Sequence, residues 1–117
     1  MSDYTIYHNP RCSKSRQTLQ LLTDRGIEPE VILYLETPPS VTALKQMINK
    51  LGITPRQLLR KGEDQYKALG LADTDKSDAE LIAAMIAEPK LIERPIVVNG
   101  ARAVLGRPPE NVLALLD

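Results

Sequence analysis

The stretch that decides the fold is DYTIYHNPRCSKSRQTLQLLTDRGIEPEVILYL, residues 3–35. Residues 3–7 alternate between apolar and polar side chains and are followed by the turn dipeptide Asn9-Pro10, which predicts a short strand. Leucines spaced among polar residues over 15–25, followed by a glycine, predict a helix with a glycine cap. EVILYL, residues 30–35, predicts a second strand. The three elements together predict a parallel βαβ unit with a right-handed crossover.

The middle of the chain carries start signals of several helices. Helix-capping residue types precede apolar periodic segments at three positions: Ser40, Thr54 and Ser77. We expect the helix that begins after Thr54 to include Leu59 and Arg60. A further short helix is expected in EDQYKALGL. These segments predict a helical insertion over about residues 40–88.

Strand signals return in PIVVNGARAVLG, residues 95–106. Two apolar segments flank Asn99-Gly100, a dipeptide typical of a β-hairpin turn. Pro108-Pro109 opens a final helix that is expected to reach Leu116. The order β-α-β, helical insertion, β-β-α predicts an α/β fold, in which helices flank a mixed four-stranded sheet.

The composition is that of an ordinary globular protein. The chain has 117 residues, 43% hydrophobic and 26% charged, and we expect residues 1–117 to form a single domain. Fifteen basic residues balance fifteen acidic ones, which disfavours nucleic-acid and membrane partners. One cysteine and one histidine make a poor metal site. We see no signal peptide and no membrane-spanning apolar run, so a cytoplasmic location is expected.

The single cysteine, Cys12, lies at or just before the start of the first predicted helix. The first amides of a helix have no internal partners, and the helix dipole adds about half a positive charge there. Arg11, Lys14 and Arg16 add cationic charge nearby. Such surroundings lower a cysteine pKa from about 8.5 to roughly 3.5–7.5. We therefore expect Cys12 to be a nucleophile at neutral pH.

A buried structural role is the alternative for Cys12, because free cysteine is among the most buried residue types. The polar neighbours of Cys12 disfavour that role. His8 can pair with Cys12 or simply end the first strand with a hydrogen bond. Ser15 completes a C-x-x-S pattern and cannot resolve a disulfide, so chemistry at Cys12 would need a thiol from a second molecule. A C-x5-R cysteine phosphatase is excluded, because Thr18 stands where that motif has arginine.

Three arginines lie at predicted joints between elements: Arg60, Arg94 and Arg107. The first is near a helix end, and the other two directly precede prolines. Taken singly, each is more typical of a solvated surface cation. Their order along the chain does not by itself bring them together.

Several separated motifs are similar to those of one known family. H-N-P-x-C-x-x-S-R at residues 8–16, E-R-P-I at 93–96 and G-R-P-P at 106–109 resemble the glutaredoxin-coupled arsenate reductase (ArsC) family. The resemblance extends to L-Y-L-E-T-P at 33–38 and L-L-R-K at 58–61, and it is particularly marked for the short YfgD-like branch. It implies a thioredoxin-like fold with a helical insertion, which agrees with the predicted order of elements.

The resemblance also implies roles for individual residues. Cys12 would be the catalytic nucleophile, with His8 and Ser15 in its environment. Three arginines would converge to bind an oxyanion: Arg60, Arg94 and Arg107. Pro95 would lie near the site and would have a cis peptide bond, which is uncommon enough to mark a functional position.

The reaction that the resemblance implies is reduction of arsenate, or a similar oxyanion. The arginines would hold the anion, and the Cys12 thiolate would displace an oxygen to form a covalent adduct. Glutathione, as co-substrate, would attack the adduct, glutaredoxin would take over the reducing equivalents, and arsenite would leave. No bound cofactor and no metal are expected.

The chain departs from well-characterised members at Ser13-Lys14, where those members have Gly-Thr. A different oxyanion is therefore also compatible with the pattern. Two other functions stay open: an Spx-like regulator that binds RNA polymerase, and a glutathione-linked thiol–disulfide oxidoreductase without arsenate specificity. Many Spx-type regulators carry C-x-x-C, whereas this chain has C-x-x-S.

Overall fold

The structure is a computed structural model that describes residues 4–73 and 75–115. The chain divides into two compact units: residues 1–37 with 94–117, and residues 38–93. We call these the sheet unit and the helical unit. The helical unit contains the predicted insertion at about residues 40–88. That both units form one domain stays a prediction.

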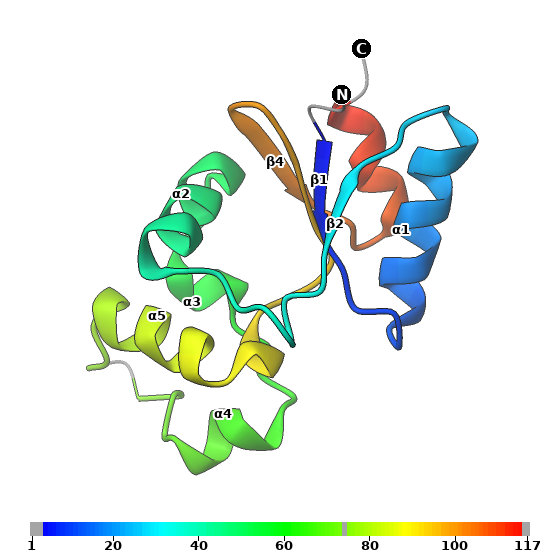
Figure 1. Ribbon diagram of the computed structural model, residues 1–117. Coiled ribbons are helices and arrows are strands. Elements are labelled where there is room, and N and C mark those ends of the chain that lie inside the picture. Colours follow the sequence, from blue (N-terminus) through cyan, green and yellow to red (C-terminus); the bar gives the residue numbers. More distant parts are fainter. Residues whose placement is uncertain (1–3, 74, 116–117) are drawn as a thin grey trace. The chain divides into compact units, whose positions relative to one another are not determined.

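The sheet unit contains a four-stranded sheet with the strand order β2-β1-β3-β4 (Figure 1). Its strands are β1 (Tyr4–Tyr7), β2 (Glu30–Ile32), β3 (Ile96–Asn99) and β4 (Arg102–Leu105). β1 pairs in parallel with β2 and antiparallel with β3, and β3 pairs antiparallel with β4. The predicted mixed sheet and the hairpin at Asn99-Gly100 are confirmed. Asp3, in the predicted first strand, lies outside the described residues.

Helix α1 (Ser13–Asp24) connects the parallel strands β1 and β2. The chain leaves the helix through Gly26, whose φ of 77° is readily available only to glycine. The N–H of Gly26 donates to the carbonyl of Thr23 at 2.9 Å, which satisfies a carbonyl left without a partner by the helix end. The predicted parallel βαβ unit with a glycine cap is confirmed.

Strand β2 is shorter than predicted. The strand expected over residues 30–35 ends at Ile32, because the carbonyl of Leu33 accepts turn bonds from the N–H groups of Glu36 at 3.0 Å and Thr37 at 2.9 Å. Tyr34 is 1% exposed within this turn. Burial and local turn bonds outweigh the strand preference of the sequence here.

The core of the sheet unit is aliphatic and lies where α1 and the 3₁₀ helix η2 (Pro109–Leu115) pack on the strands (Figure 1). Its buried members come from β1, β3, α1 and η2: Ile6, Leu22, Val97, Val112 and Leu115. The predicted final helix is present as a 3₁₀ helix, and Leu116 lies outside the described residues. An i→i+3 bond from the N–H of Asn111 to the carbonyl of Pro108, 3.0 Å long, closes its first turn.

The helical unit consists of short helices. They are α2 (Val41–Leu51), α3 (Pro55–Leu58), α4 (Asp64–Ala68), α5 (Asp78–Ala87) and the 3₁₀ helix η1 (Pro89–Leu91). Helix α5 packs against α2, α3 and η1. The predicted caps at Ser40, Thr54 and Ser77 are confirmed, and the last two form complete capping boxes.

The prediction that the helix after Thr54 continues through Arg60 is wrong. Helix α3 ends at Leu58, and Leu59 instead forms an antiparallel bridge with Ile92. The bridge is flanked by a hydrogen bond from the N–H of Arg60 to the carbonyl of Leu91, 2.8 Å long. Leu59 and Ile92 are 4% and 2% exposed, so their burial favours the extended backbone over another helical turn.

The inner strand β1 should be one of the most sensitive parts of the sheet unit. Ile6 on β1 is 0% exposed, whereas its register partner Val31 on the edge strand β2 is 43% exposed. We expect Ile6→Ala to lower the free energy of unfolding by about 2–5 kcal/mol, because it leaves a cavity. The matched variant Val31→Ala should cost less than about 1 kcal/mol. Denaturant unfolding measures both, and equal losses would contradict the assigned core.

Candidate active site

The strand register brings three chain segments together at one end of the sheet, where strands begin or finish. Tyr7, the last residue of β1, pairs with Ile96, the first residue of β3. Ile96 also pairs with Leu105, the last residue of β4. The turn after β1, the segment before β3 and the segment after β4 therefore meet at this end of the sheet. Predicted site residues lie in each of these segments.

Cys12 is the N-cap residue of α1, with φ −94° and ψ 123°. Its backbone is fixed on both sides, because its N–H donates to the carbonyl of Asn9 and its carbonyl accepts from the N–H of Arg16, each at 3.0 Å. The residue is partly exposed and forms no disulfide. Its sulfur is thus held at the start of the helix while staying within reach of a second molecule.

Donors around the sulfur favour its charged form. Burial raises the pKa of Cys12, but the backbone N–H of Ser15, the side chain of Arg94 and the backbone N–H of Lys14 together lower the pKa below the ordinary thiol value. The Cys12 side chain forms no capping hydrogen bond within the usual geometric limits. The backbone N–H groups of Ser15 and Lys14 nevertheless favour the negative charge on the sulfur, because they carry partial positive charge. These groups favour a thiolate at the helix start.

His8 and Ser15 form a buried pair beside this turn. Nδ1 of His8 and Oγ of Ser15 are joined by a hydrogen bond of 2.6 Å, and Ser15 is 0% exposed. Burial, followed by the charge of Arg16, lowers the pKa of His8, so the imidazole is neutral at physiological pH. The pair holds the segment whose amide acts on Cys12. The structure thus brings His8 to Ser15.

Asn9 shapes the same turn, although the sequence analysis treated it only as a turn residue. Its N–H donates to Oγ of Ser15 and its side-chain Oδ1 accepts from the N–H of Arg11, both at 3.0 Å. Asn9 is 7% exposed. Asparagine before proline often occupies the first position of a turn, because its side-chain oxygen can accept a hydrogen bond from the backbone N–H of the residue two positions later. That signal indicated the turn but not its link to Ser15.

Arg94, Pro95 and Arg107 form the opposite side of the site. The Arg94–Pro95 peptide bond is cis, as the family resemblance implied. Nη1 of Arg107 donates to the carbonyl of Arg94 at 3.3 Å. The Arg107–Pro108 bond is also cis, which the sequence analysis did not anticipate. Two of the three predicted arginines therefore lie together, and Arg94 acts on the Cys12 sulfur.

Arg60, the third predicted arginine, belongs to the helical unit. Its Nη1 lies 2.9 Å from Oε1 of Glu93, and its Nε lies 3.4 Å from Oε1 of Glu63. The guanidinium is thus paired with two carboxylates of its own unit. Its role in binding an oxyanion stays a prediction.

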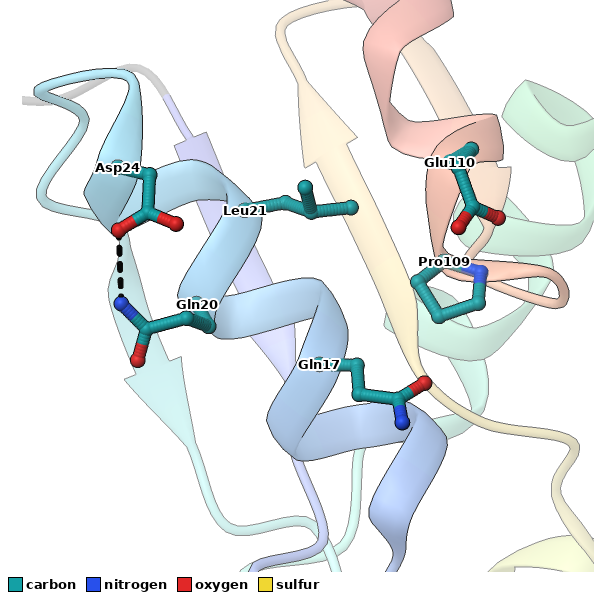
Figure 2. Close-up of a pocket in the computed structure, with 6 residues that line it drawn as sticks. All are labelled: Gln17, Gln20, Leu21, Asp24, Pro109 and Glu110. Carbon is teal, nitrogen blue, oxygen red and sulfur yellow. Dashed lines mark hydrogen bonds between the residues drawn. The ribbon is translucent and has the colours of Figure 1, made fainter.

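The described part of the sheet unit includes a groove beside the Cys12 turn and another along α1. One, of about 290 Å³, adjoins the Cys12 turn and is lined by His8, Asn9, Pro10, Arg11, Leu33, Leu35 and Glu36. The other, of about 390 Å³, runs between α1 and η2 and is lined by Gln17, Gln20, Leu21, Asp24, Pro109 and Glu110 (Figure 2). A 2.8 Å hydrogen bond between Gln20 and Asp24 lies along the second groove (Figure 2). Only the first groove includes residues of the turn that leads to Cys12.

Comparison with known proteins decides the family. The profile of the ArsC family matches residues 7–115. The chain belongs to the ArsC family.

Relatives of this ArsC-family chain are similar over nearly their whole length. YfgD of Escherichia coli strain K12 is 55% identical over 112 residues, which cover 95% of this chain and 94% of that protein. A protein of Haemophilus influenzae named arsenate reductase is 52% identical, with 95% of this chain and 97% of that protein covered. The solved structure of an arsenate reductase from Vibrio cholerae is 55% identical, with a TM-score of 0.94 and 97% of each chain covered. This likeness confirms the α/β, thioredoxin-like fold.

The described ranges contain neither a cluster of metal ligands nor a helix suited to span a membrane. Within residues 4–73 and 75–115, no group of three or more His, Cys, Asp or Glu side chains is arranged to hold a metal ion. In that same part of the chain, no helix combines the length and the apolar character needed to cross a membrane.

The contribution of Arg94 to the Cys12 site can be measured directly. We expect wild-type Cys12 to reach half of its maximal alkylation rate below about pH 8.5, the pKa of an ordinary thiol. Because a neighbouring cation favours the thiolate, Arg94→Gln should raise that midpoint by on the order of 1 pH unit. Below the midpoint, alkylation of the variant should be up to about tenfold slower.

Arg102→Gln is the matched control for that measurement. Arg102 lies at the opposite end of β4 from the site, and its guanidinium donates to the carbonyl of Leu115 at 3.1 Å. Its removal should leave the alkylation midpoint unchanged. The same midpoint in Arg94→Gln and Arg102→Gln would show that Arg94 does not act on Cys12.

Proposed function

We propose that this ArsC-family chain reduces arsenate to arsenite, with Cys12 as the nucleophile and with glutathione and glutaredoxin as the electron donors. The observation that carries the proposal is the Cys12 sulfur, placed at the start of α1 beside Arg94 with its pKa lowered. Relatives that are about half identical over nearly the full chain bear the name arsenate reductase, which supports the substrate.

The lowered pKa of Cys12 matters because the thiolate is the nucleophile. An ordinary thiol with a pKa of about 8.5 is only a few per cent ionised at neutral pH. The amide of Ser15 and the guanidinium of Arg94 shift this balance toward the thiolate. Cys12 is partly exposed, so a small anion can reach it.

The donors that favour the thiolate also suit a tetrahedral oxyanion. Backbone N–H groups at a helix start bind anions, and arginine binds them through charge-assisted bonds that are sometimes bidentate. The guanidinium of Arg107 donates to the backbone carbonyl of Arg94, which brings a second cationic side chain to the same segment. We propose that both arginines bind the oxygens of arsenate while its arsenic faces the sulfur. The family resemblance adds Arg60 as a third candidate.

The proposed reaction begins with attack of the Cys12 thiolate on arsenic(V). A sulfur–arsenic bond forms and one arsenate oxygen, with protons from solvent, leaves as water. Glutathione then displaces a second arsenate oxygen, which leaves as water, and forms a second sulfur–arsenic bond. A glutaredoxin thiol attacks the sulfur of that bound glutathione, and the electron pair of the glutathione–arsenic bond stays on arsenic. Arsenic thereby becomes arsenic(III), and it leaves as arsenite when water displaces Cys12. Two external thiols are thereby oxidised to one mixed disulfide.

External thiols are required because the chain cannot supply a second thiol. Cys12 is its only cysteine, and Ser15 stands at the second position of the C-x-x-S pattern. We propose that the small peptide thiol approaches through the groove of about 290 Å³, which is lined by His8–Arg11 of the turn that leads to Cys12. Reduced thiols are maintained in the cytoplasm, and we propose that the protein works there.

The central test is arsenite production in the presence of arsenate, glutathione and glutaredoxin. We expect turnover by the wild type and none above background by Cys12→Ser, because a serine hydroxyl is not ionised at neutral pH. Omission of glutathione should also abolish turnover. Equal rates for wild type and Cys12→Ser would exclude Cys12 as the nucleophile.

The same test separates the other two functions. Glutathionyl exchange on a small disulfide without any arsenite production would indicate a general thiol–disulfide oxidoreductase. Recovery of RNA polymerase subunits by a protein without reductase activity would indicate an Spx-like regulator.

Binding of arsenate should depend on the planar guanidinium groups. We expect Arg94→Lys and Arg107→Lys each to raise the KM for arsenate about tenfold or more, because an ammonium cannot reproduce bidentate bonds. Arg60→Lys should do the same if Arg60 is the third anion ligand. Arg102→Lys serves as control and should leave the KM unchanged. A KM unaltered in all three site variants would show that these arginines do not bind the substrate.

A further inference from the structure

Gly106 lies in a space that no side chain can occupy. A Cβ atom built on Gly106 would lie 2.5 Å from Oγ1 and 3.0 Å from Cγ2 of Thr18, and 2.8 Å from Cγ of Pro95. Cβ atoms essentially never approach heavy atoms so closely. Gly106 does not have a positive φ, so the requirement for glycine here comes from packing and not from backbone conformation. The missing side chain lets Thr18 and Pro95 pack against the same piece of backbone.

Thr18 connects this contact to the first turn of α1. Its Oγ1 donates to the carbonyl of Lys14 at 2.8 Å and lies 3.4 Å from the carbonyl of Gly106. The N–H of Lys14 is one of the groups that favour charge on the Cys12 sulfur. Thr18 is 0% exposed, so its position is set by packing on all sides. The segment after β4 is thus pressed directly onto the helix turn that carries Cys12.

Pro95 connects the same contact to Arg94. The N–H of Gly106 donates to the carbonyl of Pro95 at 2.9 Å, which fixes the segment before β3 to the segment after β4. Arg94 precedes Pro95, and its side chain acts on the Cys12 sulfur. A continuous path of contacts therefore runs from the Cys12 turn through Thr18, Gly106 and Pro95 to Arg94, and from Arg94 back to Cys12.

We propose that Gly106 and Thr18 are positioning residues for Cys12. The close packing of Thr18 and Pro95 around Gly106 holds the Arg94 guanidinium at the sulfur. An added side chain at Gly106 would push the Pro95 segment away from α1 and would carry Arg94 with it. This inference rests on the proposed role of Cys12 as the nucleophile, but its readout requires no arsenate.

In the sequence, Thr18 stands where a C-x5-R phosphatase has arginine, which excludes that class of enzyme. The position six residues after Cys12 is nevertheless close to the site, because it lies on the buried side of α1 one turn beyond Ser15. Thr18 acts there through packing and a backbone hydrogen bond, where the phosphatase motif would place a guanidinium.

Gly106→Ala tests the proposal through the pH dependence of Cys12 alkylation. Loss of the Arg94 contact disfavours the thiolate, so the midpoint should move upward by up to about 1 pH unit. At a pH below both midpoints, alkylation should be up to about tenfold slower than in the wild type, and at high pH the two rates should converge. An unchanged midpoint in a folded Gly106→Ala protein would overturn the proposal.

Gly62→Ala is the matched control for the added methyl group. A Cβ at Gly62 would meet nothing within 4 Å, and its φ is not positive. Its alkylation profile should equal that of the wild type. A midpoint shift in Gly62→Ala as large as in Gly106→Ala would show that the readout is not specific to the packed contact.

A double variant separates positioning from general loosening of the fold. If Gly106 acts through Arg94, Gly106→Ala should cause no further shift in an Arg94→Gln background, since the contact is already lost. A merely structural role would leave the two shifts additive, and additive shifts would overturn the proposal.

Thr18→Ala keeps the proposal testable if Gly106→Ala does not fold. It removes Oγ1 and Cγ2, two of the three atoms that crowd Gly106, and adds nothing to the core. We expect a smaller upward shift of the alkylation midpoint, and an unchanged midpoint in the folded variant would count against positioning. A wild type that makes no arsenite while these shifts are observed would contradict the proposed function alone.

Discussion

A sulfur that is partly withdrawn from water can hold a negative charge only if fixed donors replace the water it loses. Burial by itself raises the pKa of Cys12 and would leave an inert thiol. The amides of Ser15 and Lys14 and the guanidinium of Arg94 outweigh that effect. The amides come from the start of α1, whereas Arg94 comes from a segment some eighty residues later. The chemistry of the site therefore depends on how the sheet joins distant parts of the chain.

The antiparallel pairing of β3 with both β1 and β4 supplies that connection. This pairing places the last residue of β1, the first residue of β3 and the last residue of β4 at the same end of the sheet. Contacts at Gly106 then fix the distance between the Pro95 segment and α1, with 2.9 Å between the N–H of Gly106 and the carbonyl of Pro95. The donors of such a site are already in place before the anion arrives. Little free energy is therefore lost to rearranging them when the anion binds.

Local signals in the sequence were sufficient for most elements. Caps at Ser40, Thr54 and Ser77, the Asn99-Gly100 turn and the glycine after α1 each act within a few residues, so their structures follow from local chemistry. The errors arose where distant contacts decide. Leu59 leaves the helical path to pair with Ile92, and the strand at residues 30–35 ends early in a turn around the buried Tyr34. In the same way, the position of Cys12 could be predicted from its neighbours, but the approach of Arg94 could be expected only from the family resemblance.

The most direct measurement of the central claim is the ultraviolet absorbance of the Cys12 thiolate as a function of pH. Subtraction of the Cys12→Ser spectrum removes the contribution of the tyrosines. We expect the midpoint of the thiolate absorbance to lie below about pH 8.5, the pKa of an ordinary thiol, because the amides and Arg94 lower the pKa of Cys12. A single transition at or above about pH 8.5 would contradict the account, because the sulfur would then be largely protonated where the enzyme must work.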